Sequence, residues 1–166
     1  MTWQRILCPT DINDASIEAL RTASELCLSA SASLYVLHII EDLVVPGMGV
    51  QLSFGREIPR SEYQSERKKI KQLLQQHISK SVTAHILVDR GEAAEQIVHE
   101  AVTRSIDLIV LSRSKRNIVE ELLFPSVADT VFRHAPCPVL LVPRRQETRT
   151  HRKKRHLLQK HQWVKQ

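Results

Sequence analysis

Long apolar segments are missing from this sequence of 166 residues. A helix that crosses a membrane needs about 18 or more consecutive apolar residues, and no run in the chain reaches that length. The N-terminal segment has too short an apolar stretch for a secretory signal peptide and no small-residue cleavage site. We therefore expect a cytoplasmic protein without a membrane partner, and the length predicts a single folded domain.

Cysteines are few and widely spaced, since the chain has three and no two of them form a C-x-x-C pair. An odd number at such spacings is typical neither of a disulfide framework nor of a zinc site. Cys8 and Cys137 lie in or beside apolar runs, and Cys27 lies on the apolar face of a predicted helix. We interpret all three as small buried apolar side chains and expect no metal site.

Sequence motifs of common catalytic sites are absent as well. The chain contains no G-x-S-x-G, H-E-x-x-H or Walker-type phosphate loop. A catalytic nucleophile needs a base and an oxyanion or metal partner, and the residue pattern suggests no such set. Asp11 is a lone carboxylate, which is more typical of a hydrogen-bond acceptor than of a base. The sequence by itself predicts a protein that is not an enzyme.

What the chain does contain is a regular alternation of strand-like and helix-like segments. Short apolar runs alternate with segments whose apolar residues recur at helical spacing. The runs span residues 5–9, 34–40, 82–88, 108–111 and 138–142, and we expect the last two to be buried strands. The alternation predicts a doubly wound, Rossmann-like α/β fold with a five-stranded parallel sheet and helices on both faces.

Three further features lie between or within these runs. Residues 41–58 hold three of the four glycines, so we expect a long loop that is poorly ordered around Gly47. His38 is interpreted as a core histidine with satisfied hydrogen bonds rather than as a ligand. Residues 126–134 predict a short helix that opens with Ser126 as its cap, with Asp129 three residues later as in a capping box. The apolar face of this helix is predicted to comprise Val127, Val131, Phe132 and Ala135.

Several segments of the chain resemble the universal stress protein family. They are RILCPTD at residues 5–11, VLHIIED at 36–42, the turn at 91–97, and DLIVLS and HAPCPVLLVP within residues 107–143. The resemblance covers about residues 3–143 and implies an adenine nucleotide alpha hydrolase-like sheet with strand order 3-2-1-4-5. It also divides the chain into a universal stress protein domain at 1–143 and a basic tail at 144–166.

The phosphate-binding loop of that family is altered here. ATP-binding members follow a strand with G-x-x-G-x9-G-S/T, whose glycines allow positive φ and close approach of backbone N–H groups to phosphate. The spacing is kept, but the glycine positions are Ser112, Lys115 and Pro125, and Pro125 has no N–H. Losing two or three charged hydrogen bonds of about 1.5–3 kcal/mol each weakens binding roughly a thousandfold or more. We expect no cofactor, with ATP bound weakly at most.

The adenosine half of the site matches the family pattern, and Ser126 has an explanation without any ligand as the helix cap. If a nucleotide site is retained, the resemblance implies that it comprises Pro9, Thr10, Asp11, Ile39, Leu111, Ser112, Lys115, Ser126 and Val127. Arg113, Lys115 and Arg116 place positive charge in the loop. An ATP-binding member with a divergent loop, possessing slow hydrolysis, is therefore an alternative interpretation.

The tail at 144–166 holds nine of the 24 lysines and arginines and one of the 18 acidic residues, so it carries +8 and the remainder −2. Its run Arg152, Lys153, Lys154 and Arg155 is a candidate contact for DNA, RNA or another polyanion, which is a second alternative function. A solvated extension is the competing interpretation. We expect the tail to be either disordered or a helix docked through its apolar residues Leu157, Leu158 and Trp163.

The last strand is the expected contact between two copies of the chain. The resemblance implies a homodimer that is paired through Val139, Leu140, Leu141 and Val142. An edge strand this apolar would be prone to aggregation if it were uncovered, and a second copy of the chain would cover it. Taken together, these features favour a non-catalytic binding or regulatory module of the stress response, with a protein partner that the sequence does not identify.

Overall fold

The computed structural model describes residues 2–12, 14–41, 43–45, 50–52, 57–113 and 126–143. Strands and helices alternate along these residues, as the sequence predicts. In chain order they are β1 (Arg5–Pro9), α1 (Asp14–Ala30), β2 (Ser33–Ile40), β3 (Leu43–Val45), β4 (Val50–Leu52), α2 (Arg60–His77), β5 (Ala84–Arg90), α3 (Ala93–Thr103), β6 (Leu108–Arg113), α5 (Val127–His134) and β7 (Val139–Pro143).

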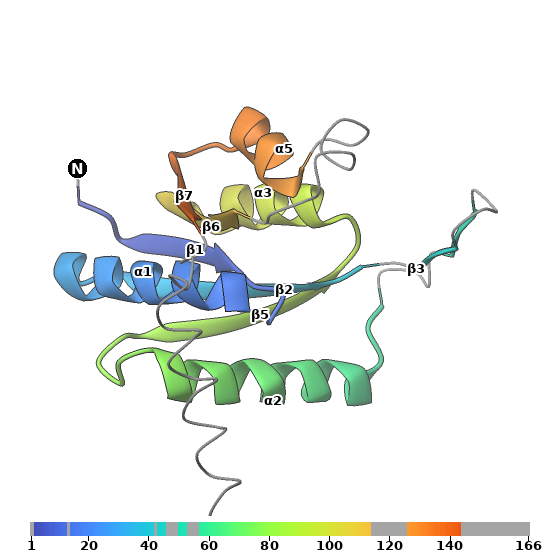
Figure 1. The fold of residues 1–166 in the computed structure, drawn as a ribbon, viewed down its shortest axis with the longest axis horizontal. Coiled ribbons are helices and arrows are strands. Elements are labelled where there is room, and N and C mark those ends of the chain that lie inside the picture. Colours follow the sequence, from blue (N-terminus) through green and yellow to red (C-terminus); the bar gives the residue numbers. More distant parts are fainter. Residues whose placement is uncertain are drawn as a thin grey trace, which may run out of the picture.

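The main sheet has five strands in the order β5-β2-β1-β6-β7, and every neighbouring pair is parallel. Counted among the strands of this sheet alone, the order is 3-2-1-4-5, which confirms the predicted fold. Figure 1 shows α1 and α2 on one face of the sheet and α3 and α5 on the other. Among the described residues, no helix combines the length and the apolar character that crossing a bilayer requires.

The core consists of two apolar clusters, one on each face of the sheet. Along β1, Ile6 and Cys8 pack into the cluster that contains residues of α1 and α2, whereas Leu7 packs into the cluster that contains residues of α3 and α5. Successive side chains of a strand point to opposite faces, so a strand covered on both faces needs an uninterrupted apolar run. This requirement is why the central strands were recognisable in the sequence.

Two of the three cysteines are buried in this core as predicted, whereas Cys137 is only partly buried. Cys8 and Cys27 are buried, and all three thiols are free. Burial, reinforced by the neighbouring Cys27, raises the pKa of Cys8 to about 12, and burial raises the pKa of Cys27 to about 11. Both thiols therefore stay protonated and unreactive near neutral pH.

The segment at 41–58, predicted as one long loop, contains a short hairpin. β3 and β4 pair antiparallel, with Leu43 opposite Leu52 and Val45 opposite Val50. Strands of three residues are too short to show a period in the sequence, so the prediction of a loop was wrong for them. Gly47, around which poor order was expected, lies outside the described residues.

The strand predicted at residues 138–142 is confirmed by β7, and it lies at the edge where the strand order implied by the resemblance places it, but the burial expected for it was wrong. β7 is an edge strand, and Leu140 and Leu141 are 38% and 41% exposed. Similarly, α5 faces the core through the fully buried Val131, whereas Phe132, expected on its apolar face, is 66% exposed. An apolar run reads the same in the sequence whether the strand lies at the centre of a sheet or at its edge.

Two helices end in a Schellman motif with a serine in the left-handed conformation. After α1, Ser31 has φ 55° and the Ala32 N–H donates to the Cys27 carbonyl at 2.9 Å. After α3, Ser105 has φ 50° and the Ile106 N–H donates to the Ala101 carbonyl, also at 2.9 Å. Glycine usually occupies this position because it has no Cβ to crowd the backbone.

We therefore expect Ser31→Gly to raise the free energy of unfolding by about 0.5–1 kcal/mol, because it relieves the left-handed strain. Ser65→Gly is the matched control, because Ser65 is an exposed serine inside α2, and this change should lower the free energy by about 0.5 kcal/mol. Urea unfolding measures both. A loss of stability in both variants would contradict the assignment.

Candidate functional site

The carboxyl ends of β1, β2 and β6 border a pocket of about 820 Å³. In a doubly wound sheet, ligands bind at this edge, where the strand order reverses. The pocket is lined by every residue that the sequence placed in the nucleotide site except Lys115, which lies outside the described residues. The lining residues of that predicted set are Pro9, Thr10, Asp11, Ile39, Leu111, Ser112, Ser126 and Val127.

Thr10 is buried, and its hydrogen bonds stabilise the turn after β1. Its N–H donates to the Leu37 carbonyl at 2.8 Å, and its hydroxyl donates to the Ser16 hydroxyl at 3.0 Å. The same hydroxyl accepts the Ile12 N–H at 3.1 Å. Ile12 has φ 62°, a strained conformation for a β-branched residue that costs about 1–2 kcal/mol. The hydrogen bonds of Thr10 hold this turn in place.

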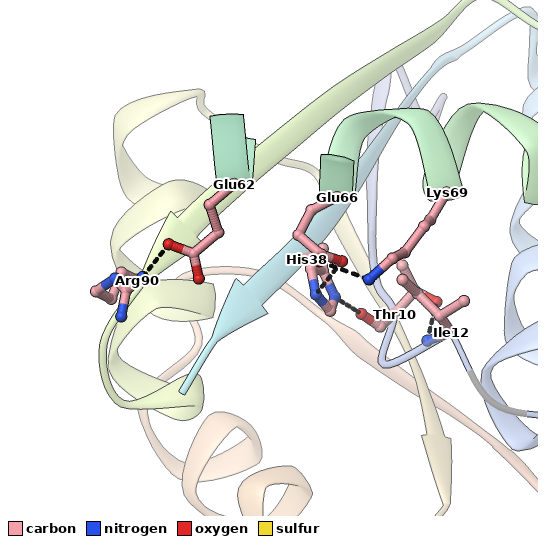
Figure 2. A network of polar contacts seen from close by, with 7 residues as sticks. All are labelled: Thr10, Ile12, His38, Glu62, Glu66, Lys69 and Arg90. Atoms are coloured by element: carbon pink, nitrogen blue, oxygen red, sulfur yellow. Dashed lines mark hydrogen bonds and ion pairs between the residues drawn. The ribbon is translucent and has the colours of Figure 1, made fainter. Parts of the chain in front are cut away.

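His38 lies in the wall of the pocket, where it connects the turn to α2 (Figure 2). Its Nδ1 lies 2.9 Å from the Thr10 carbonyl, which can only accept, so Nδ1 carries a proton. Its Nε2 lies 3.6 Å from a carboxylate oxygen of Glu66, and the other oxygen of Glu66 lies 2.7 Å from Lys69 Nζ. The predicted hydrogen bonding of His38 is confirmed, but its placement in the core was wrong, since it faces the pocket.

Glu62, one turn before Glu66 on α2, is held by the last residue of β5 (Figure 2). Arg90 Nη2 donates to Glu62 Oε2 at 2.6 Å. The Arg90 side chain is only 7% exposed, and its Nε has no hydrogen-bond partner among the described residues. A buried guanidinium needs a carboxylate nearby, so Glu62 is bound to this position by the charge of Arg90.

The charged residues that line the pocket are all acidic among the described residues. Its lining combines an apolar wall with five carboxylates and includes no lysine or arginine among the described residues. Lys69 and Arg90 contact two of the carboxylates without lining the pocket themselves. The apolar wall comprises Leu37, Ile39, Ile97, Leu111, Val127 and Leu141, and the carboxylates, which we call the acidic rim, are Asp11, Glu41, Glu62, Glu66 and Asp129.

Ser126 forms the helix cap that the sequence predicted. Its hydroxyl oxygen accepts the Asp129 N–H at 3.1 Å, and the hydroxyl donates to Asp129 Oδ2 at 2.7 Å. Both functions of the hydroxyl are thus used inside α5. A phosphate bound at Ser126 would have to compete with the Asp129 carboxylate for this hydrogen.

The pocket has the composition of a small-molecule binding site. Burial, followed by the charge of Glu100, raises the pKa of Asp89, but Asp89 does not line the pocket. Within the described residues, no group of three or more His, Cys, Asp or Glu side chains is placed to hold a metal ion. An apolar wall next to hydrogen-bond acceptors can take a flat ring with polar substituents, which is the common form of a small-molecule site.

Sequence reasoning missed the wall that α2 contributes. Glu62 and Glu66 are four residues apart, which places them on the same side of a helix, and this spacing was visible in the sequence. That α2 turns this side toward the end of β2 depends on how the helix packs, which the spacing does not reveal. Ala93 and Ile97 of α3 were missed for the same reason.

Comparison with known proteins connects this chain to a family. The profile of the Universal stress protein family matches residues 2–143. Universal stress protein MJ0531 of Methanocaldococcus jannaschii is 30% identical over 142 residues, which cover 84% of this chain and 82% of that protein.

Two solved structures are similar in fold. A universal stress protein in complex with cAMP has a TM-score of 0.61 and 19% identity, covering 87% of this chain and 100% of its own. The universal stress protein from Archaeoglobus fulgidus in complex with dAMP has a TM-score of 0.56 and 23% identity, covering 85% of this chain and 98% of its own.

The Glu62–Arg90 pair gives a stability prediction. Glu62→Gln should lower the free energy of unfolding by about 2 kcal/mol, because it leaves the buried Arg90 charge without its carboxylate, although the partial exposure of Glu62 moderates the loss. Arg90→Met should cost less, because it removes the buried charge itself. The control Lys69→Gln breaks an exposed pair and should cost less than about 1 kcal/mol. Equal losses for Glu62→Gln and Lys69→Gln in urea unfolding would refute the prediction.

Proposed function

The chain belongs to the universal stress protein family, and we propose that it is a non-catalytic binding module of the stress response. Its pocket takes an adenine nucleoside or a nucleoside monophosphate in preference to ATP. The observation that carries this proposal is the composition of the pocket, in which the predicted adenosine-binding residues meet an acidic rim without a lysine or arginine among the described lining residues. Relatives of the same fold in complex with cAMP and dAMP support it.

The nucleoside half of the pocket has the chemistry that a purine needs. Ile39 and Leu111 supply apolar surface from two strands on either side of β1, and a flat base between them is removed from water. Asp11 lies at the end of the turn after β1 and offers carboxylate oxygens, which accept hydrogen bonds from ribose hydroxyls.

The phosphate half of the pocket disfavours a long anion. Two like charges about 8 Å apart repel by on the order of 0.5–2 kcal/mol, depending on the local dielectric. ATP therefore loses more than AMP when it meets the acidic rim. The glycines that would donate backbone hydrogen bonds are replaced by Ser112, Lys115 and Pro125. The hydroxyl of Ser126 is already engaged by Asp129.

We also propose that two copies of the chain pair through β7. This strand is at the edge of the sheet, and Leu140 and Leu141 leave about two fifths of their surface exposed. A second copy related by a two-fold axis would cover these side chains and use the open backbone groups of the edge.

Calorimetric titration with adenosine, AMP and ATP tests the ligand class. We expect ATP to bind at least about tenfold more weakly than adenosine at low salt, with a smaller difference at high salt because the repulsion is screened. No magnesium-dependent hydrolysis of ATP is expected. Micromolar affinity for ATP would instead favour the alternative in which Arg113, Lys115 and Arg116 replace the glycines.

Restoring the three glycines provides the control for this test. The combined change Ser112→Gly, Lys115→Gly and Pro125→Gly should raise the affinity for ATP more than that for adenosine, since it rebuilds only the phosphate half. Pro125→Gly alone should help less. Pro136→Gly, which alters an exposed proline that does not line the pocket, should change neither affinity. Equal gains for both ligands would argue against a divided pocket.

Sedimentation tests the pairing through β7. Leu140→Lys places a charge on the edge strand and should convert dimers to monomers, or cause aggregation if the exposed edge finds other partners. Val102→Lys is a matched control, because Val102 is an exposed apolar residue on α3. A soluble monomer formed by the unchanged protein would rule out the dimer.

A further inference from the structure

Helix α2 carries most of its positive charge on a different side from its negative charge. Its two acidic residues, Glu62 and Glu66, line the pocket, and each contacts a cation, Arg90 and Lys69 respectively. The other charged side chains of the helix before His77 are all lysines and arginines, and all of them are exposed. The acidic residues of α2 therefore belong to the pocket, whereas most of its cations face solvent.

Four of these cations follow one side of α2, which we call the basic stripe. In an α-helix, residues three or four positions apart lie on the same side, and so do residues seven, eight or eleven positions apart. Lys71 follows Arg60 by eleven positions, so the four cations extend over about 17 Å of the helix axis. Two glutamines share this side with them, and no acidic residue does. The basic stripe comprises Arg60, Gln64, Arg67, Lys68, Lys71 and Gln75.

The fold leaves the charge of the basic stripe uncompensated within the described residues. None of its four cations forms an ion pair there, and Arg67 Nη1 donates to the hydroxyl of Tyr63 at 3.3 Å. The exposed acidic residue closest in the sequence is Glu57, three positions before Arg60. Like charges four positions apart, such as Arg67 and Lys71, repel each other and destabilise a helix. A solvated helix surface typically alternates the two signs, so this pattern favours a negatively charged partner.

The position of α2 makes the basic stripe accessible to a large partner. The helix packs over β5, which is an edge strand of the main sheet. Figure 1 shows α2 at the periphery of the described elements. Its buried residues Ile70, Leu73 and Leu74 belong to the core, and every residue of the basic stripe lies on the exposed part of the helix surface.

The chemistry of the basic stripe matches the backbone of a double-stranded nucleic acid. Each strand of a duplex has one phosphate per about 3.4 Å of its axis, so a stripe of about 17 Å can face roughly five phosphates. Lysine and arginine side chains neutralise phosphates, and glutamine amides donate hydrogen bonds to phosphate and sugar oxygens. Single-stranded binding sites add aromatic side chains on which bases stack, and the basic stripe contains none.

An anionic membrane surface matches this helix less well. A helix that lies on a membrane inserts an apolar face next to its basic face. The apolar residues of α2 pack in the core or against it, and its exposed residues are all polar or charged. A duplex needs no such insertion, because its phosphates are reached from the surface.

We infer that the basic stripe of α2 binds the phosphate backbone of a double-stranded nucleic acid without preference for a sequence. This site is separate from the pocket and does not depend on the proposed function. It also differs from the tail, whose basic run is a candidate polyanion contact on the sequence alone, because the basic stripe stands on the observed geometry of a helix.

Fluorescence anisotropy of a labelled DNA duplex, titrated with the full chain, tests this inference. We expect binding that weakens as the salt concentration rises, because neutralised phosphates release counterions. Removing three cations of the basic stripe should reduce the slope of log K against log salt by about 2–3, since each phosphate contact contributes about 0.9. The changes are Arg67→Gln, Lys68→Gln and Lys71→Gln.

Two further variants control for net charge and for the sign of the stripe. The first removes three exposed cations from other elements and should leave the slope unchanged; its changes are Arg5→Gln, Arg21→Gln and Arg133→Gln. The second keeps the charge of the stripe and should also keep the slope; its changes are Arg67→Lys, Lys68→Arg and Lys71→Arg. Urea unfolding checks that each variant retains its fold.

The basic run of the tail requires a separate comparison. The three stripe changes are repeated in a chain whose tail run is neutralised by Arg152→Gln, Lys153→Gln, Lys154→Gln and Arg155→Gln. The inference requires that the stripe changes weaken duplex binding in this chain as well. If neutralising the tail abolishes binding and the stripe changes have no effect in either chain, the tail is the contact and the inference is overturned.

Three other results would also overturn it. They are equal losses for the stripe variant and the charge control, no duplex binding at low salt, and binding to phosphatidylserine vesicles in place of the duplex. Titration with adenosine keeps this inference apart from the proposed function. None of the changed residues lines the pocket, so adenosine affinity should be the same in every variant whether or not the duplex binds.

Discussion

The pocket depends on the hydrogen bonds of one buried threonine. Thr10 ties the end of β1 to β2 through its N–H, to α1 through its hydroxyl, and to His38 through its carbonyl. These bonds also hold Ile12 in a conformation that its branched side chain disfavours. A turn so constrained keeps the main chain around Pro9 and Asp11 in a fixed place. The wall formed by α2 is then positioned against it through His38 and Glu66.

The parts of this site that the sequence predicted share one physical origin. In a parallel sheet the carboxyl ends of the strands meet at one edge, so the residues after β1, β2 and β6 had to lie together once the strands were recognised. The rest depends on how elements pack. The spacing of Glu62 and Glu66 shows that they share a side of α2, but not which surface that side faces. Likewise, the apolar residues of β7 do not by themselves indicate that this strand lies at the edge of the described sheet.

The site combines an inherited frame with altered chemistry. The strand order is that of the universal stress protein fold, whereas the positions predicted from the family resemblance to hold the loop glycines are Ser112, Lys115 and Pro125. Ser126 keeps its place in the sequence and has a complete local role as the cap of α5. The cap accounts for Ser126 without any ligand, which is why a motif alone is weak support for a ligand.

Leu141 belongs to two surfaces at once, since it lines the pocket and also lies half exposed on the open edge of β7. The proposed binding of a ligand in the pocket and the proposed self-association through β7 would therefore act on the same side chain. Two equilibria that share a residue are coupled, and the coupling free energy is the same in both directions. The apparent affinity of the pocket would then vary with the total concentration of the protein, so that its abundance in the cell would act as a second input to ligand binding.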